Sequence, residues 1–92
     1  STSISQEMLN DMDISLFPNP SVDVIAVQTP GLLRDDLRLE LIDLTGRVLQ
    51  TSVIESGSTI AYFDTQPLNN GTYLVRIQSD EGQIVRKVIV AR

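Results

Sequence analysis

Cysteine, histidine and tryptophan are absent from this sequence of 92 residues, which contains only two Phe and two Tyr. Without cysteine, the chain can form no disulfide, no thiolate metal site and no thiol nucleophile. Without histidine, it lacks the usual general base near neutral pH and the commonest transition-metal ligand. We therefore expect no catalytic residues, no metal site and no cofactor, and we predict that the protein is not an enzyme.

Basic residues are also scarce, since seven Lys and Arg stand against twelve Asp and Glu, for a formal net charge of −5. An acidic chain does not suit nucleic acid or an anionic membrane as its main partner. The longest aliphatic run near the end, residues 88–91, is far shorter than the ~20 residues that span a bilayer. Residues 1–10 have neither the basic start nor the apolar block of a secretory signal, so we expect any such signal upstream, on a longer protein.

What the chain does contain is a series of short apolar and β-branched segments, separated by turn residues every ~8–12 positions and without a convincing helical period. We expect strands at residues 13–17, 22–27, 37–41, 47–53, 59–64, 72–78 and 83–90. The alternation of the third strand breaks at Ile42, which predicts a bulge or a switch of face near Asp43. This pattern predicts an all-β domain, an antiparallel β-sandwich of about seven strands over residues 13–92, preceded by a polar linker at residues 1–12.

Two motifs are expected mainly to shape the backbone. Pro18-Asn19-Pro20 removes two hydrogen-bond donors and forces an extended or turning path, which ends the first strand. Direct contact of this motif with a partner is the alternative. Gly71 can adopt a positive φ at a turn, and Tyr73 is expected to be a core anchor whose hydroxyl needs a hydrogen-bond partner.

The turn between the third and fourth strands also has a local explanation. Gly46 is expected to take a backbone conformation that a side chain would hinder. Asp43 and Arg47 flank this turn, where their charges can pair. The motif therefore predicts a tight hairpin that belongs to the scaffold.

The final strand leaves two interpretations open. Its residues Lys87, Val88, Ile89 and Val90 are apolar and β-branched enough to close a sheet. As an exposed edge, the same strand could instead donate hydrogen bonds to a partner strand by β-augmentation. An exposed edge would also favour strand-swapped or edge-paired dimers at high concentration.

Taken in order, these motifs resemble a known family. They are Leu-Phe-Pro-Asn-Pro at residues 16–20, Leu-Ile-Asp-Leu-Thr-Gly-Arg-Val-Leu at 41–49, Leu-Asn-Asn-Gly-Thr-Tyr-Leu-Val-Arg-Ile at 68–77, and Arg-Lys-Val-Ile-Val at 86–90. Their order and spacing resemble the C-terminal sorting domain, type A, of cargo proteins of the type IX (Por) secretion system of Bacteroidetes. The resemblance covers about residues 13–92, and it implies an immunoglobulin-like sandwich of seven strands that is not an enzyme.

The resemblance also implies a function and a set of partners. The domain would be a folded sorting signal that is recognised in the periplasm. It would follow an N-terminal cargo domain through the outer membrane to the cell surface or the medium. Its partners would be the type IX translocon, an outer-membrane shuttle protein and a sortase-like surface peptidase. That peptidase usually removes the domain, and the family's cut would fall in or before residues 1–12.

Particular residues match the family's motifs by position. Lys87 and the aliphatic residues 88–90 match its terminal signal, and Gly71 with Tyr73 matches its Gly-x-Tyr element. The trailing Ala91-Arg92 is a departure, because chains of the family commonly stop within a residue or two of the aliphatic run.

A second function remains in view beside the sorting signal. The chain could be an immunoglobulin-like accessory module that binds carbohydrate or supports adhesion on an extracellular enzyme. The small number of aromatic residues argues against a sugar-stacking platform, so we rank this alternative second.

Overall fold

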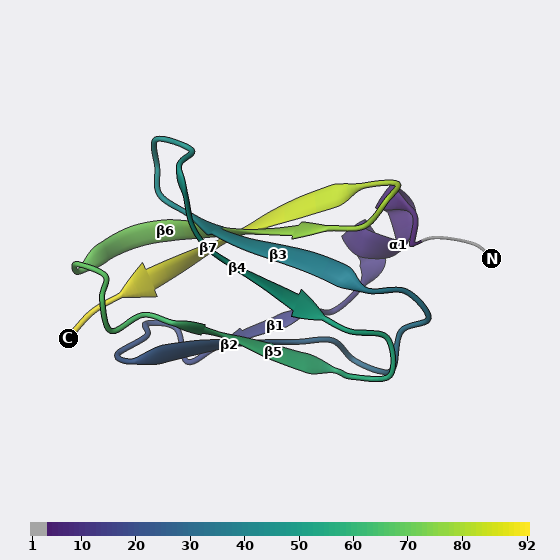
Figure 1. Cartoon of the computed structure of the whole chain (residues 1–92), viewed down its shortest axis with the longest axis horizontal. Helices are drawn as coiled ribbons and strands as arrows, with labels where there is room; N and C mark the ends of the chain where they lie inside the picture. The colour runs from purple at the N-terminus through teal and green to yellow at the C-terminus, as the bar shows by residue number, and fades with distance from the viewer. Residues whose placement is uncertain (1–3) are drawn as a thin grey trace.

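Segments of alternating apolar and polar residues form seven strands in the computed structural model, which describes residues 4–92 (Figure 1). The elements in chain order are α1 (Gln6–Asp11), β1 (Ser15–Phe17), β2 (Val24–Gln28), β3 (Leu37–Ile42), β4 (Val48–Ile54), β5 (Ile60–Asp64), β6 (Gly71–Gln78) and β7 (Gln83–Val90). Every predicted strand has a counterpart, and the predicted all-β class is confirmed.

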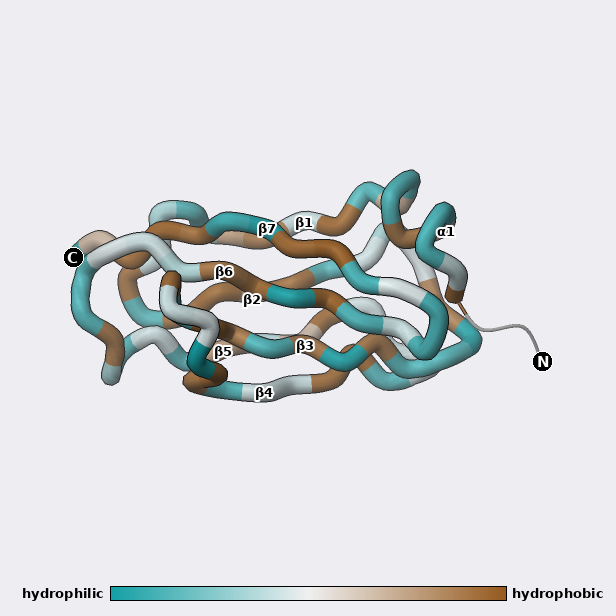
Figure 2. The backbone as a smooth tube through the Cα atoms, turned by 90° about the horizontal axis from the view of Figure 1, so that it is seen from above, coloured by the Kyte–Doolittle hydropathy of each residue, from teal (hydrophilic) through white to brown (hydrophobic). Residues whose placement is uncertain are grey.

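The strands pair antiparallel in two sheets, a smaller one with the order β1-β2-β5 and a larger one with the order β4-β3-β6-β7. The chain passes from the smaller sheet (β1 and β2) to the larger one (β3 and β4), returns for β5 and ends in the larger sheet (β6 and β7), which forms an immunoglobulin-like sandwich, as predicted. β4 lies beside β3 in the larger sheet, so the smaller sheet has only three strands. In Figure 2 the edge strands β1 and β7 lie along one long side of the sandwich, and β4 and β5 lie along the other.

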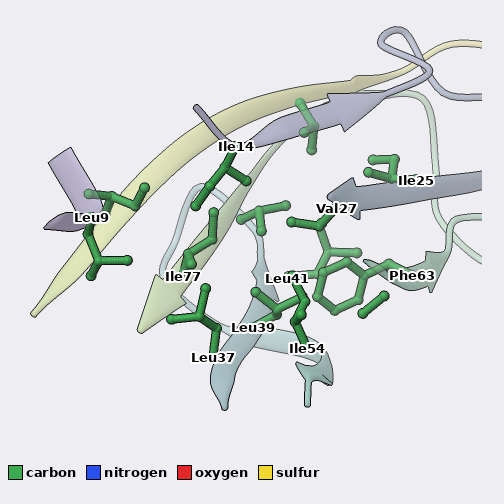
Figure 3. Packing of buried hydrophobic residues seen from close by; sticks show 14 of the residues in the cluster. Leu9, Ile14, Ile25, Val27, Leu37, Leu39, Leu41, Ile54, Phe63 and Ile77 are labelled. Atoms are coloured by element: carbon green, nitrogen blue, oxygen red, sulfur yellow. The ribbon is translucent and has the colours of Figure 1, made fainter. Parts of the chain in front are cut away.

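The core fills the space between the sheets with side chains at alternate positions of each strand (Figure 3). In β3, Leu37, Leu39 and Leu41 are buried between the sheets. Phe63 of β5 is the largest fully buried side chain, and Ala61 is buried on the same face. The predicted irregularity is also present, because the pairing of β3 with β4 shifts register between Leu41 and Ile42.

The segment that the sequence predicts to be a linker is packed against the sandwich over its described part. Residues 1–3 of that linker lie outside the described residues. Ile4 is 3% exposed and Leu9, in α1, is 0% exposed, and both belong to the main core cluster. Ser5 caps α1 by accepting a hydrogen bond from the backbone N–H of Met8 at 3.2 Å. We call residues 4–14 the N-terminal strap.

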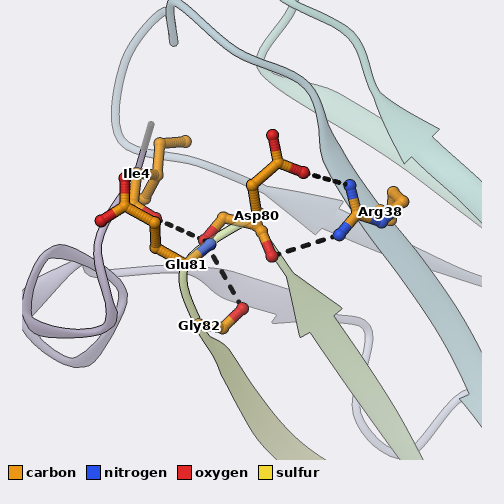
Figure 4. Close-up of polar contacts among 6 residues, drawn as sticks. Ile4, Arg38, Asp80, Glu81 and Gly82 are labelled. Carbon is orange, nitrogen blue, oxygen red and sulfur yellow. Dashed lines mark hydrogen bonds and ion pairs between the residues drawn. The ribbon is translucent and has the colours of Figure 1, made fainter. Parts of the chain in front are cut away.

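Polar contacts hold the strap to the turn between β6 and β7. The Gln6 side chain donates to the carbonyl of Gln83 at 2.7 Å and accepts from its N–H at 2.8 Å, as a neighbouring strand would. Ser79 Oγ donates to the carbonyl of Ile4 (Figure 4). At Gly82, an added Cβ would lie 2.7 Å from the Cα of Gln6, so this glycine makes room for the strap.

A glutamine side chain closes the opposite side of the sandwich in a similar way. Gln50 of β4 donates to the carbonyl of Asp64 in β5, and its Oε1 accepts from the N–H of Asp64 at 3.1 Å. This side-chain amide links the edge strands of the two sheets through the two hydrogen bonds that a neighbouring strand would make. On both long sides of the sandwich, side chains therefore form hydrogen bonds with backbone groups of an edge strand that would otherwise be unpaired.

Candidate functional site

One end of the sandwich collects the motifs that the sequence singles out. We call this end the C-terminal pole and define it as residues 18–23, 43–47, 65–73 and 87–92. In Figure 1 the C-terminus lies at this end and α1 lies at the other. The strand register explains the grouping, because Ile42 at the end of β3 pairs with Leu74 near the start of β6, and Gly71 pairs with Val90 at the end of β7.

The Pro18-Asn19-Pro20 motif connects the smaller sheet to the end of β7. β1 ends at Phe17, directly before the motif. Asn19 Oδ1 then accepts a hydrogen bond from the N–H of Ile89 at 3.0 Å. The chain continues as a short parallel bridge, in which the N–H of Ser21 donates to the carbonyl of Ile89 at 2.7 Å. The motif thus ends one strand and fastens another that is about 70 positions away in the sequence.

Gly71 and Tyr73 shape the start of β6. Gly71 has a φ of 156°, which residues with a side chain rarely adopt, although no atom lies within 4 Å of the position of an added Cβ. Tyr73 is half-buried against the core, and its hydroxyl donates to the carbonyl of Asn69 at 2.7 Å. This arrangement resembles the tyrosine corner of immunoglobulin domains, in which a Tyr near the start of a late strand bonds to the backbone a few residues upstream.

Arg92 is the anchor that sequence reasoning missed. Its guanidinium donates to the carbonyls of Val22 at 2.8 Å and Thr65 at 3.0 Å, and also to that of Leu68. Its backbone N–H donates to Asn70 Oδ1 at 3.1 Å. A planar group with five N–H donors is well suited to several carbonyls at once, so one side chain ties two loops to the end of β7.

Replacing Arg92 with alanine is expected to lower the free energy of unfolding by about 1 kcal/mol, because the bonds are charge-assisted but the residue is exposed to solvent. Urea unfolding of both proteins measures this difference. Arg86→Ala is the matched control, since the Arg86 guanidinium makes only a 3.4 Å contact with the neighbouring carbonyl of Val85. Equal stability of the two variants would contradict the anchoring role of Arg92.

The candidate recognition residues of β7 divide between the core and the surface. Val88 is 0% exposed and Val90 is 1% exposed, whereas Lys87 is exposed and Ile89 is 38% exposed. Alternate side chains of this strand therefore close the sandwich while the others face solvent. The second sequence interpretation, pairing of the strand edge with a partner strand, stays a prediction. Only Lys87 and Ile89 offer their side chains to a partner.

The β3–β4 turn projects from the sandwich at the pole (Figure 1). Asp43 Oδ1 accepts hydrogen bonds from the Thr45 hydroxyl at 2.5 Å, the Thr45 N–H at 2.9 Å and the Arg47 N–H at 3.0 Å. The Arg47 Nε lies 3.4 Å from Asp43 Oδ2. Gly46 has a φ of 93°, in the left-handed region that favours glycine. Local contacts alone therefore define this turn.

These contacts lower the pKa of Asp43 below its ordinary value of 3.8, chiefly through the Thr45 hydroxyl, because they stabilise the charged carboxylate. A carboxyl with a depressed folded pKa contributes stability above its unfolded pKa and loses it as the pH falls through the folded value. We expect an NMR titration of the Asp43 carboxyl to have its midpoint below 3.8. Thr45→Val should raise that midpoint more than Arg47→Gln does, and the reverse order would contradict the assignment.

The described part of the chain lacks both a metal-binding cluster and a membrane-spanning helix. Among residues 4–92, no group of three or more acidic side chains is placed to hold a metal ion. In the same range, no helix has the length and apolar character needed to cross a membrane.

Comparison with known proteins gives one result for nearly the whole chain. The family model described as a secretion system C-terminal sorting domain matches residues 15–91. Among curated proteins, none matches this sequence. The matched range starts at β1, includes nearly all of the C-terminal pole, and leaves out the whole N-terminal strap with α1.

Proposed function

Because this chain belongs to the family of Por secretion system C-terminal sorting domains, we propose that its C-terminal pole is the surface that the type IX secretion machinery reads. The family is a non-catalytic signal domain, and membership implies secretion of the attached protein across the outer membrane. The partners proposed for the pole are the translocon and an outer-membrane shuttle protein. The secreted protein would pass through the periplasm and reach the cell surface or the medium.

The observation that supports this proposal is the convergence of every candidate recognition residue on one end of the sandwich. Gly71 pairs with Val90, and Tyr73 pairs with Val88. Lys87 and Ile89, which lie in β7 with these two valines, have their side chains on its outer surface. We propose that these two exposed side chains are read directly, whereas Gly71, Tyr73 and the two buried valines set their positions.

Removal of the domain by a sortase-like surface peptidase is a second part of the proposal. The resemblance to the family implies a cut in or before residues 1–12. Within that stretch, the carbonyl of Ile4 is bonded to Ser79 at the β6–β7 turn, and Leu9 is buried, so a peptidase has poor access there. We therefore propose that the cut lies N-terminal to Ile4, at the junction with the cargo domain.

An export assay with point variants tests the proposed function. The chain is fused to the C-terminus of a periplasmically exported fluorescent protein in a host with a working type IX system. Deleting residues 88–92 would also remove core side chains, so the informative variants are Ile89→Thr and Lys87→Ala, which keep the core intact. Export of the wild-type fusion and a reduced level for these two variants is expected. Retention of the wild-type fusion in the periplasm would overturn the proposal.

The carbohydrate-binding alternative gains one specific observation. Phe17 and Tyr62 are 43% and 58% exposed, and both lie opposite Ala26, so they stand in one row on the outer face of the smaller sheet. Two exposed rings with a small residue between them could stack on sugar rings. A glycan array with hits that disappear in Tyr62→Ala would favour this function over the sorting signal.

The edge-paired or strand-swapped dimer stays a prediction. Gln6 occupies the backbone of Gln83 at one end of the β7 edge, and Asn19 with Ser21 occupies that of Ile89 at the other. Edge pairing of two chains would have to displace both blocks. A single monomer mass by light scattering at millimolar concentration would count against the dimer.

A further inference from the structure

The edge of β7 has a short open window. In an antiparallel ladder, the backbone groups of alternate residues point away from the paired strand. The backbone groups of Gln83 and Ile89 point outward, as their hydrogen bonds show: Gln83 bonds to Gln6, and Ile89 bonds to Asn19 and Ser21. Val85 and Lys87 share this orientation. Within residues 4–92, their N–H groups and the carbonyl of Lys87 have no partner across this edge, and the carbonyl of Val85 has only the 3.4 Å contact from Arg86.

The window is bounded on both sides and is therefore short. The strap blocks it at Gln83 and the Pro18–Ser21 segment blocks it at Ile89, so only Val85 and Lys87 remain available for pairing. Two such residues in an antiparallel pair exchange four hydrogen bonds with a partner segment of three residues. The window thus fits a short extended peptide and excludes a long strand.

The charge at the window is uncompensated. Three basic residues, Arg38, Arg76 and Lys87, stand on the outer face of the larger sheet. Arg38 pairs with Asp80 at 3.0 Å, and Arg76 pairs with Glu40 at 2.7 Å. In the described part of the chain, Lys87 has no carboxylate within 4.0 Å. A partner carboxylate opposite Lys87 would complete the pattern of this face.

The side chains around Lys87 are apolar. Val85 and Ile89, its neighbours on the same face of β7, are 43% and 38% exposed. Leu74 pairs directly with Lys87 in β6, and Ile42 in β3 pairs with Leu74. Beyond the carboxylate, a partner peptide should therefore place an apolar side chain on this face, next to Val85.

We propose that the Val85–Lys87 window takes an extended, antiparallel segment of a partner protein with the pattern acidic, any residue, apolar. The acidic residue lies opposite Lys87 and the apolar one lies opposite Val85. This inference rests on the proposed function, and it names the chemistry of the partner that would read the sorting domain. It also shifts the proposed backbone pairing from residues 87–90 to Val85 and Lys87.

Two experiments test the window independently. In the first, the ¹⁵N-labelled domain is titrated with a nine-residue peptide centred on Glu-Thr-Val, with a Lys-Thr-Val peptide as the control. We expect amide shifts and slowed exchange at Val85 and Lys87 with the Glu peptide only, and at least about tenfold weaker binding to Lys87→Glu. Shifts that are equal for both peptides, or that centre elsewhere, would overturn the proposal.

The second experiment is the export assay with Lys87→Pro. Proline there removes an N–H that faces the open edge and leaves the bonds to β6 in place, so the fold should survive. We expect at least about tenfold less export, in line with lost pairing. Arg34→Glu, at an exposed basic residue outside the pole, is the charge control and should stay within about twofold of wild type.

The two experiments separate the window from the function it serves. Full export of a folded Lys87→Pro domain overturns the window while the sorting function stands. Periplasmic retention of the wild-type fusion, together with specific binding of the Glu peptide, overturns the sorting function while the window stands.

Discussion

Replacing Leu9 with alanine is expected to lower the free energy of unfolding by about 2–5 kcal/mol, the range for a fully buried leucine. Leu9 is 0% exposed, and it belongs to the same core cluster as residues of both sheets. The loss would leave a cavity under the strap, because α1 is held on its polar side by Gln6 and cannot collapse freely. Urea unfolding monitored by circular dichroism measures the change. A domain of this size has only about 5–15 kcal/mol in total, so the effect would be large.

Met8 supplies the matched control for this experiment. It is adjacent to Leu9 in α1 but is 49% exposed, so Met8→Ala is expected to change the stability by no more than about 0.5 kcal/mol. Removal of residues 1–14 should cost at least as much as Leu9→Ala. If Leu9→Ala and the truncation were both as stable as the full chain, the strap would not be part of the folded domain.

The strands could be predicted from the sequence, whereas the strap could not. Leu37, Leu39 and Leu41 alternate with charged residues, and this local pattern leaves a strand with one buried face as the simplest solution. In the strap, the few apolar residues are spread without a clear period. A six-residue helix is not stable by itself. Its structure depends on contacts with Gln83 and Gly82, more than 70 positions away, which no local pattern reveals.

The same distinction separates the parts of the pole. Asp43, Gly46 and Arg47 form a turn from contacts within five residues, and their geometry follows from their spacing. The role of Arg92 could not be inferred in this way, because its acceptors are backbone carbonyls in loops whose positions are set only after both sheets have packed. No local sequence pattern indicates that this arginine will lie close in space to an Asn-rich turn. The two residues that looked like a departure from the family therefore include an anchor of the pole.

Val88→Asp is expected to unfold the domain, with a loss of more than about 4 kcal/mol, because it would bury an unpaired carboxylate in the core. Ile89→Asp places the same side chain one position along, on the exposed face, and should change the stability by no more than about 1 kcal/mol. Urea midpoints of the two variants measure this contrast. Equal losses would mean that the alternation of buried and exposed residues in β7 is not as described.

This contrast decides how the terminal motif is to be read. Truncations and substitutions at Val88 or Val90 change the fold, so a loss of export in such variants says nothing about direct recognition. Ile89→Asp keeps the core intact. It places a carboxylate next to Lys87, where it would repel the acidic side chain of the proposed partner segment. Export should therefore fall in Ile89→Asp although the domain stays folded. If this folded variant were exported as well as wild type, the outer face of β7 would not be the recognition surface, and the loops held by Arg92 would be the next part of the pole to test.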